Sequence, residues 1–179
     1  MAMCYGLFLA AVFVGLLHSI TGASGAPMIP FVDGRWHGDI ATGPNNTNFE
    51  ECWASTTFDD GTTFAITKRK DGKWYLQFSN PGWRLPPLRR YTMVALIDFY
   101  PRLRITAEAK TQVLLEIADL DHISLLRLIE NGHRIDLSSD SFNEKFELEG
   151  SAKVIERIRN CFSDQSVAAK PATHNSSEH

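Results

Sequence analysis

Short runs that alternate apolar and polar residues, each closed by a turn signal, occupy the middle of this chain. The run "CWASTTF" (52–58) is followed by Asp-Asp-Gly, and "TFAITK" (63–68) precedes a second Asp-Gly turn. A period of two residues is typical of a β-strand with one buried face, and Asp-Gly favours tight hairpin turns. The pattern therefore predicts a series of antiparallel hairpins.

The same pattern continues downstream. In "WYLQFS" the residues Trp74, Leu76 and Phe78 share one face, while "YTMVALID" (91–98) is apolar almost throughout, as in a strand covered on both sides. One short strand is expected around Trp36. Further strands are expected at 104–110, with Ile105, Ala107 and Ala109 inward, at 111–117, with Val113, Leu115 and Ile117 inward, at 133–138 and at 142–148.

Two segments have helical periodicity. The first, 121–131, has Asp121 as a plausible N-cap and Gly132 as its stop. The second, 151–162, can be capped by Ser151, and its apolar residues form one stripe. We therefore expect one internal and one C-terminal helix, the latter docked on the sheet.

Together these elements predict a mostly β (α+β) fold, an antiparallel β-sandwich or a partly open barrel of eight to nine short strands. An immunoglobulin sandwich does not fit, because the second cysteine lies on a helix. The length suits one domain, at 27–162, preceded by a leader at 1–26 and followed by a polar tail at 163–179 that we expect to be disordered.

The leader determines the expected compartment. Residues 1–26 contain no Asp, Glu, Lys or Arg, and an apolar run there is followed by small residues. This is typical of a secretory signal peptide, so we expect a periplasmic or secreted protein. An uncleaved membrane anchor is the alternative, and it is the one membrane contact that the sequence predicts; His18 interrupts the apolar run.

Removal of the leader would leave two cysteines, Cys52 near the start of the body and Cys161 near its end. In an oxidising compartment they could form a disulfide closing a long loop, worth about 4–5 kcal/mol. Two unpaired buried thiols are the alternative. No further cysteine or paired histidine spacing accompanies them, so no metal site is predicted.

Signs of catalysis are weak. The histidines are scattered, and no Gly-x-Ser-x-Gly, His-Glu-x-x-His or phosphate-binding glycine loop is present, so no cofactor is predicted. The acidic cluster "DLDH" (119–122) suits a helix start better than a metal. Asp98 closes the most apolar strand, where it could anchor a turn or act in a hydrolase with His122 or His133.

Charge is distributed unevenly along the chain. Residues 68–104 carry nine basic and two acidic residues, whereas 105–149 carry four basic and ten acidic ones. These segments could form separate basic and acidic faces, or neighbouring strands could interleave so that the charges pair. The formal net charge of -3 does not favour nucleic-acid binding.

The stretch "NPGWRLPPLRRY" (80–91) joins two expected strands. Asn80-Pro81-Gly82 fits a type II turn, and the two later prolines keep the segment out of the sheet. The apolar residues Trp83, Leu85 and Leu88 could then cover one end of the core. That structural account leaves the arginines unexplained. The alternative is a corner that also binds an anionic group, with these contact residues: Trp83, Arg84, Arg89 and Arg90.

Several of these residues occur in the order seen in a known family. They are Trp36-His37-Gly38, Cys52, an Asp-Gly turn, Trp74, Asn80-Pro81-Gly82-Trp83, Asp98, Leu148-Glu149-Gly150-Ser151 and Cys161. Over 34–162 the chain resembles small secreted or periplasmic β-rich, single-disulfide domains of alphaproteobacteria, of the rhizobial type. The resemblance implies the fold, the disulfide and the compartment, but no activity. A looser likeness to the invasion-associated periplasmic proteins rests on architecture.

The sequence thus favours a non-catalytic domain that binds a macromolecule, for which an anionic partner suits the arginines, at the cell envelope. A lipocalin-like carrier of a small ligand is one alternative, because Gly34-Arg35-Trp36 near the expected mature start resembles the tryptophan that closes such barrels. The hydrolase built on Asp98 is the other.

Overall fold

The computed structural model describes residues 30–42, 48–120, 124–140 and 142–168. The expected leader and residues 169–179 lie outside this part of the chain. No helix in the described part is long and apolar enough to cross a membrane.

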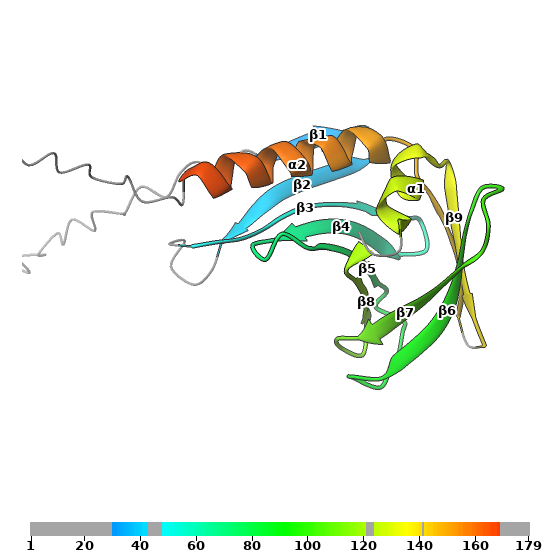
Figure 1. Cartoon of the computed structure of the whole chain (residues 1–179). Helices are drawn as coiled ribbons and strands as arrows, with labels where there is room; N and C mark the ends of the chain where they lie inside the picture. Colours follow the sequence, from blue (N-terminus) through cyan, green and yellow to red (C-terminus); the bar gives the residue numbers. More distant parts are fainter. Residues whose placement is uncertain (1–29, 43–47, 121–123, 141, 169–179) are drawn as a thin grey trace, which may run out of the picture.

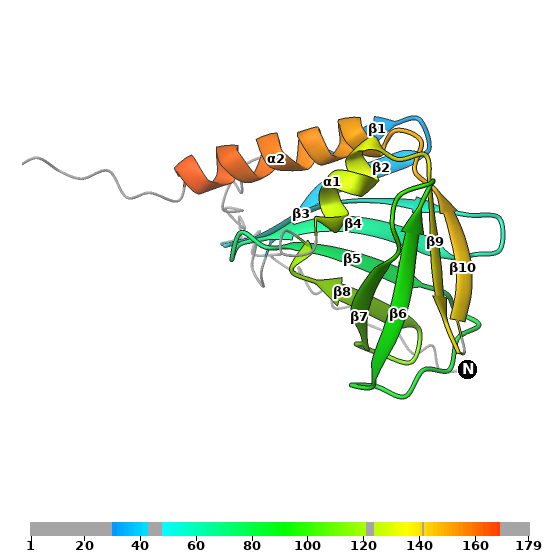
Figure 2. The same ribbon diagram turned by 45° about the vertical axis from the view of Figure 1, so that its right-hand side comes forward.

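The strands form one antiparallel sheet in the order β1-β2-β3-β4-β5-β8-β7-β6-β9-β10 (Figures 1 and 2). Their bounds are β1 Phe31–Asp33, β2 Trp36–Thr42, β3 Phe49–Thr57, β4 Thr63–Arg69, β5 Trp74–Ser79, β6 Arg90–Ile97, β7 Leu103–Ala109, β8 Leu114–Ala118, β9 Arg134–Ser139 and β10 Phe142–Glu147. The mostly β fold with two helices is confirmed. The described residues form ten strands where eight to nine were expected, and the sheet does not close into a barrel.

The sheet turns sharply between β8 and β7. These strands share only two residue pairs, Glu108 with Glu116 and Ala109 with Leu115. Beyond this turn, β6, β7, β9 and β10 run steeply across the direction of β2–β5 (Figure 2). The result is an open, half-barrel shape with the core on its inner side.

The predicted hairpin turns are present. Gly61 and Gly72 adopt the positive φ angles of 81° and 80° that favour glycine. Asp60 accepts hydrogen bonds from the backbone N–H and the hydroxyl of Thr62, and Asp71 accepts one from the Lys73 N–H. The Asp-Gly signals thus set the β3–β4 and β4–β5 turns as expected.

Aromatic side chains fill the centre of the core. The ring of Phe64 stacks on that of Phe78 at 5.0 Å, and Phe146 packs against both, at 5.6 and 4.8 Å. Trp36 adds an edge contact to Phe64, and its indole N–H donates to the Glu149 carbonyl. The predicted inward residues of the strands are buried, except Val113, which precedes β8 and is half-buried.

Two helices cover the open side of the sheet, α1 (Leu125–Asn131) and α2 (Ser151–Ala168) (Figure 1). The α1 N-cap is Ser124 without a side-chain cap; the proposed cap, Asp121, lies outside the described residues. The hydroxyl of Ser151 donates to the Ile129 carbonyl, so it links the two helices. Helix α2 continues to Ala168, so the expected tail is helical over 163–168.

Gly132 ends α1 for a reason other than the expected one. Its φ of -94° is open to any residue. An added Cβ, however, would lie 2.4 Å from Cγ2 of Ile97 and 2.8 Å from the Leu128 carbonyl oxygen. Glycine is required here for the close approach of α1 to β6.

The Cys52–Cys161 disulfide is formed, with a Cα–Cα distance of 6.2 Å. It joins β3 in the sheet to α2, across a sequence separation of 109 residues. The predicted pairing is confirmed, and the alternative of two free thiols is wrong.

Loss of this bridge should destabilise the fold strongly. Replacing both cysteines, C52A/C161A, is expected to lower the free energy of unfolding by about 4 kcal/mol, because the unfolded chain regains the entropy that the long loop removes. Urea unfolding measures the change. A reductant should lower the urea midpoint of the wild type and leave that of the variant unchanged. Equal midpoints of wild type and variant without reductant would contradict the prediction.

Candidate functional site

The predicted corner, residues 80–91, begins with a turn of a different type from the expected one. The side-chain oxygen of Asn80 accepts a hydrogen bond of 2.7 Å from the Gly82 N–H. The main-chain carbonyl of Asn80 accepts another from the Trp83 N–H. Gly82 has no positive φ, so the type II prediction is wrong. The asparagine side chain organises the turn instead.

The apolar residues of the corner divide into two groups. Trp83 packs edge-on against Phe142 at 5.2 Å, and Leu85 also packs against the core, as expected. Leu88 does not: its side chain is 74% exposed and its φ is 66°. The Leu88 N–H donates to the Ala109 carbonyl, and this bond holds the backbone while the side chain points to solvent.

The three arginines of the corner contact three different parts of the chain. Arg84 donates to the carbonyls of its own turn, those of Pro81 and Trp83. The Arg89 guanidinium lies 5.3 Å from the centre of the Tyr91 ring, and Arg90 pairs with Glu108 at 3.4 Å. The structure therefore provides intramolecular roles that the sequence did not suggest. Anion binding by Trp83, Arg84, Arg89 and Arg90 stays a prediction.

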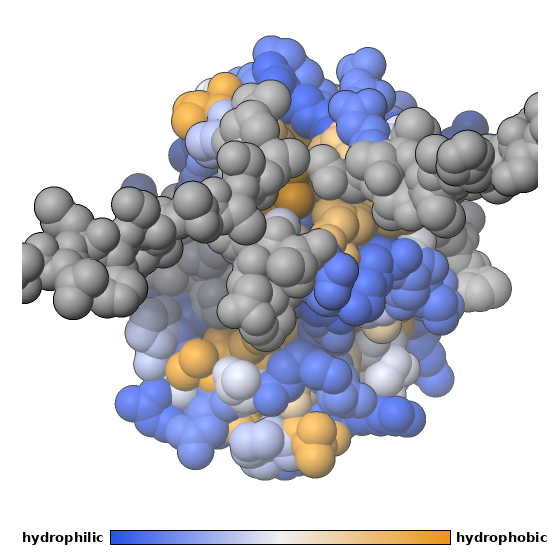
Figure 3. All heavy atoms as spheres, turned by 90° about the vertical axis from the view of Figure 1, so that its left-hand side faces the viewer, coloured by the Kyte–Doolittle hydropathy of each residue, from blue (hydrophilic) through white to orange (hydrophobic). Residues whose placement is uncertain are grey.

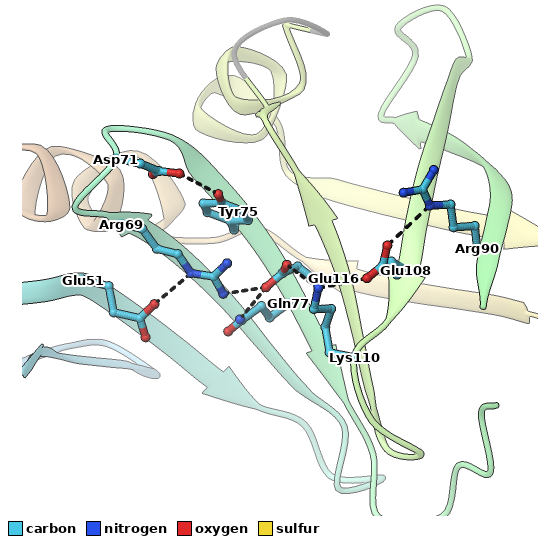
Figure 4. Close-up of polar contacts among 9 residues, drawn as sticks. All are labelled: Glu51, Arg69, Asp71, Tyr75, Gln77, Arg90, Glu108, Lys110 and Glu116. Atoms are coloured by element: carbon cyan, nitrogen blue, oxygen red, sulfur yellow. Dashed lines mark hydrogen bonds and ion pairs between the residues drawn. The ribbon is translucent and has the colours of Figure 1, made fainter. Parts of the chain in front are cut away.

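Arg90 belongs to a polar network on the outer face of the sheet, opposite the core (Figure 4). At its centre is Glu116, which is only 6% exposed. Its carboxylate accepts hydrogen bonds from Arg69 at 2.6 Å and Gln77 at 3.0 Å, and Lys110 lies 3.9 Å away. A buried carboxylate needs such partners, because an unpaired charge there is costly.

The basic residues of the network lie between its acidic ones. Arg69 also pairs with Glu51. Glu108 and Glu116 are direct cross-strand neighbours, and Lys110 lies between their carboxylates. Although burial opposes it, the hydrogen bonds and charges of Glu116 and Glu51 raise the pKa of Arg69 above its ordinary value. The hydrogen bond from Lys110 lowers the pKa of Glu108.

These pairs decide how the two charged segments are arranged. Arg69, Lys73 and Arg90, from the basic segment, pair with Glu116, Asp119 and Glu108, from the acidic one. At these three positions the basic segment is interleaved with the acidic one, as in the second of the two predicted arrangements. On the face shown in Figure 3, hydrophobic patches are small and separated by hydrophilic residues where grey atoms do not cover it.

Asp98 ends β6 with a φ of 47° and holds the following turn. Its carboxylate accepts hydrogen bonds of 2.9 Å from the backbone N–H groups of His133 and Arg134, at the start of β9. The backbone hydrogen bond from His133 is the main reason that the pKa of Asp98 lies below its ordinary value. Anchoring a turn, one of the two predicted roles, accounts for these contacts.

The hydrolase alternative receives limited support. Nδ1 of His133 lies 3.4 Å from the Asp98 carboxylate, within hydrogen-bonding distance. The other proposed histidine, His122, lies outside the described residues. The carboxylate is, however, already committed to two backbone N–H groups. The adjacent hollow is lined by Asp98, Phe99, Tyr100, Asn131 and His133, which include no serine, threonine or cysteine nucleophile. No group of acidic, histidine and cysteine side chains in the described ranges could hold a metal.

The aromatic turn, residues 98–102 between β6 and β7, is the surface that the sequence analysis missed. Phe99 is fully exposed, at 104% of its reference area, and Tyr100 is 45% exposed. The turn projects beyond its strands at the upper right of Figure 1. Two consecutive aromatics before a proline, after the strand that Asp98 closes, are the signal that could have indicated it.

A recess adjoins the aromatic turn. The hollow beside Phe99 measures about 530 Å³, and a second of about 440 Å³ is lined by Tyr100, Ser124, Arg127, Leu128 and Asn131. The two share Tyr100 and Asn131, so the recess extends from the turn along α1. The aromatic turn and this recess form the candidate binding surface.

The network makes Arg69 important for stability. The variant R69A should lose about 2 kcal/mol of unfolding free energy, because it leaves Glu116 buried beside Glu108 without its closest cation. The matched control K110A, which removes a more exposed partner, should cost less than about 1 kcal/mol. Thermal or urea unfolding measures both, and equal losses would contradict the central role of Arg69.

Replacing Asp98 should loosen the aromatic turn. Because the folded state lowers the pKa of Asp98, its ionised form stabilises the fold above about pH 4, and that stability is lost as the pH falls through the lowered value. The D98N variant should be less stable by about 1.5–3 kcal/mol near pH 7. The difference in unfolding free energy between D98N and wild type should shrink towards pH 2. A difference that does not change with pH would contradict the anchoring role of the Asp98 carboxylate. The exposed control D140N should behave as wild type.

No protein-family model matches the chain, and no curated protein matches it either. Among solved structures, the chain is similar to the crystal structure of invasion associated protein B from Bartonella henselae, with a TM-score of 0.56 and 12% sequence identity. The match covers 76% of this chain and 98% of that chain. At this identity the likeness shows the fold alone, and it agrees with the looser likeness predicted from the architecture.

Proposed function

We propose that this protein is a non-catalytic extracytoplasmic domain that binds another macromolecule at the cell envelope through its aromatic turn. One observation carries the proposal: Phe99 is fully exposed on a turn that Asp98 holds in place. Large exposed aromatic residues commonly act as anchors at binding surfaces.

Backbone hydrogen bonds hold the turn in place before any partner arrives. The Tyr100 N–H donates to the Ile97 carbonyl at 2.9 Å, and the Asp98 N–H donates to the Arg134 carbonyl at 3.1 Å. Together with the Asp98 carboxylate, these bonds connect the turn to β6 and β9. Because binding would order the backbone of the turn little further, burial of Phe99 and Tyr100 would contribute to affinity with little loss of conformational entropy.

The compartment is part of the proposal. Disulfides persist in oxidising environments, and the Cys52–Cys161 bridge therefore supports secretion or a periplasmic location. The apolar leader at 1–26 supports the same route. We also propose membership of the alphaproteobacterial family of small secreted domains, which rests on the ordered motifs from Trp36 to Cys161.

The carrier alternative receives less support than binding at the surface. The centre of the half-barrel, where a carrier would hold its ligand, is occupied by the packed rings of Phe64, Phe78 and Phe146. The corner at 80–91 stays a second candidate surface, because Leu88 and Arg89 are exposed there.

Site-specific photocrosslinking in the producing cell tests the proposal. A photoreactive phenylalanine analogue at position 99 should give a defined adduct, whether protein or lipid, and the adduct should be lost in the Y100S background. The same analogue at position 88, which is also exposed and lies at the opposite end of β6, is the matched control. Adducts at 88 but not at 99 would move the site to the corner; adducts at neither position would contradict the proposal.

A further inference from the structure

We propose that the partner contacted by the aromatic turn at the cell envelope is an anionic phospholipid surface, an inference that rests on the proposed function. In this arrangement Phe99 and Tyr100 enter the membrane interface, and Arg102 and Arg104 bind the lipid phosphates. The sequence had predicted membrane contact only through an uncleaved leader.

The charges around the turn favour an anionic partner. Arg102 and Arg104 are both exposed, and the described residues provide no salt bridge to either. They follow Phe99 by three and five residues, at the end of the turn and at the second position of β7. Long arginine side chains can reach headgroups while an adjacent aromatic enters the apolar region.

Acidic groups near the turn already have intramolecular partners. Asp98 accepts backbone hydrogen bonds from β9, and Asp136 pairs with Arg134 at 2.9 Å. Glu130, on α1 beside the recess, pairs with Arg159 of α2 at 2.6 Å. Since neutral N–H groups do not cancel the charge of Asp98, the segment from Asp98 to Arg104 carries one net positive charge.

The shape of the turn also suits a membrane. Phe99 projects fully from a turn that stands beyond the sheet (Figure 1), so a partner must surround the ring to bury it. A protein would need a matching pocket, whereas a lipid interface accommodates a projecting aromatic without one. Tyr100, with a polar hydroxyl on an apolar ring, is of the type enriched at membrane interfaces.

Binding to lipid vesicles tests the inference. The purified protein should co-sediment with vesicles of equal parts phosphatidylglycerol and phosphatidylcholine, and at least tenfold less with pure phosphatidylcholine. The variant R102E/R104E should lose at least tenfold of its affinity for the anionic vesicles, since each basic residue near such a surface contributes about fivefold. The variant F99S/Y100S should lose binding to a similar extent.

The control V32S/R35E changes an exposed valine and an exposed arginine around the β1–β2 turn, outside both candidate surfaces, and should bind as wild type. Thermal unfolding checks that all the variants keep the wild-type fold. Absence of wild-type binding, or equal binding by the turn variants and the control, would overturn the inference. If position 99 then still crosslinks to a protein, the proposed function survives and the partner is that protein; if it crosslinks to nothing, both fail.

Discussion

The packing of Phe146 against Phe64 and Phe78 is the contact on which the overall shape depends. Phe146 lies on β10, the last strand in the sheet order, while its partners lie on β4 and β5. The hydrogen-bonded ladder does not connect these strands directly, so side-chain packing holds the curvature of the open sheet. Such a contact has no directional requirement, and it leaves the sheet open enough for α1 and α2 to fill the remaining side.

Because the core lies on the inner side of the sheet, the charged residues of the outer face have to be stabilised by one another. Glu108 and Glu116 face each other across β7 and β8, where like charges repel, and Lys110 and Arg69 offset that repulsion. This balanced face offers little net charge to a partner. The aromatic turn differs, because its acid, Asp98, is satisfied by the backbone of β9 while its arginines stay available. A binding surface can therefore exist on a molecule with a modest overall charge.

Much of the fold could be predicted, because period-two alternation and Asp-Gly turns depend on neighbours in sequence. The inward positions on β5 and β7 and the hairpins at Gly61 and Gly72 followed from local rules. The candidate site could not be predicted in the same way. Leu88 was expected to cover the core, but its side chain is exposed while its backbone N–H bonds to the Ala109 carbonyl. Phe99 belongs to no sequence pattern that predicts exposure, and its exposure in the structure is what makes it a proposed contact residue.

The sequence alone predicted most of the strands, the mainly β class and the two cysteines that could pair, since each depends on residue type and spacing. Tertiary structure decided the rest. Whether Arg90 is available or paired depends on Glu108 being its cross-strand neighbour, and the sheet register sets that pairing. Likewise, Asp98 becomes an anchor only because β9 brings two N–H groups to it. Exposure and pairing are properties of distant segments brought together, and local sequence patterns do not encode them.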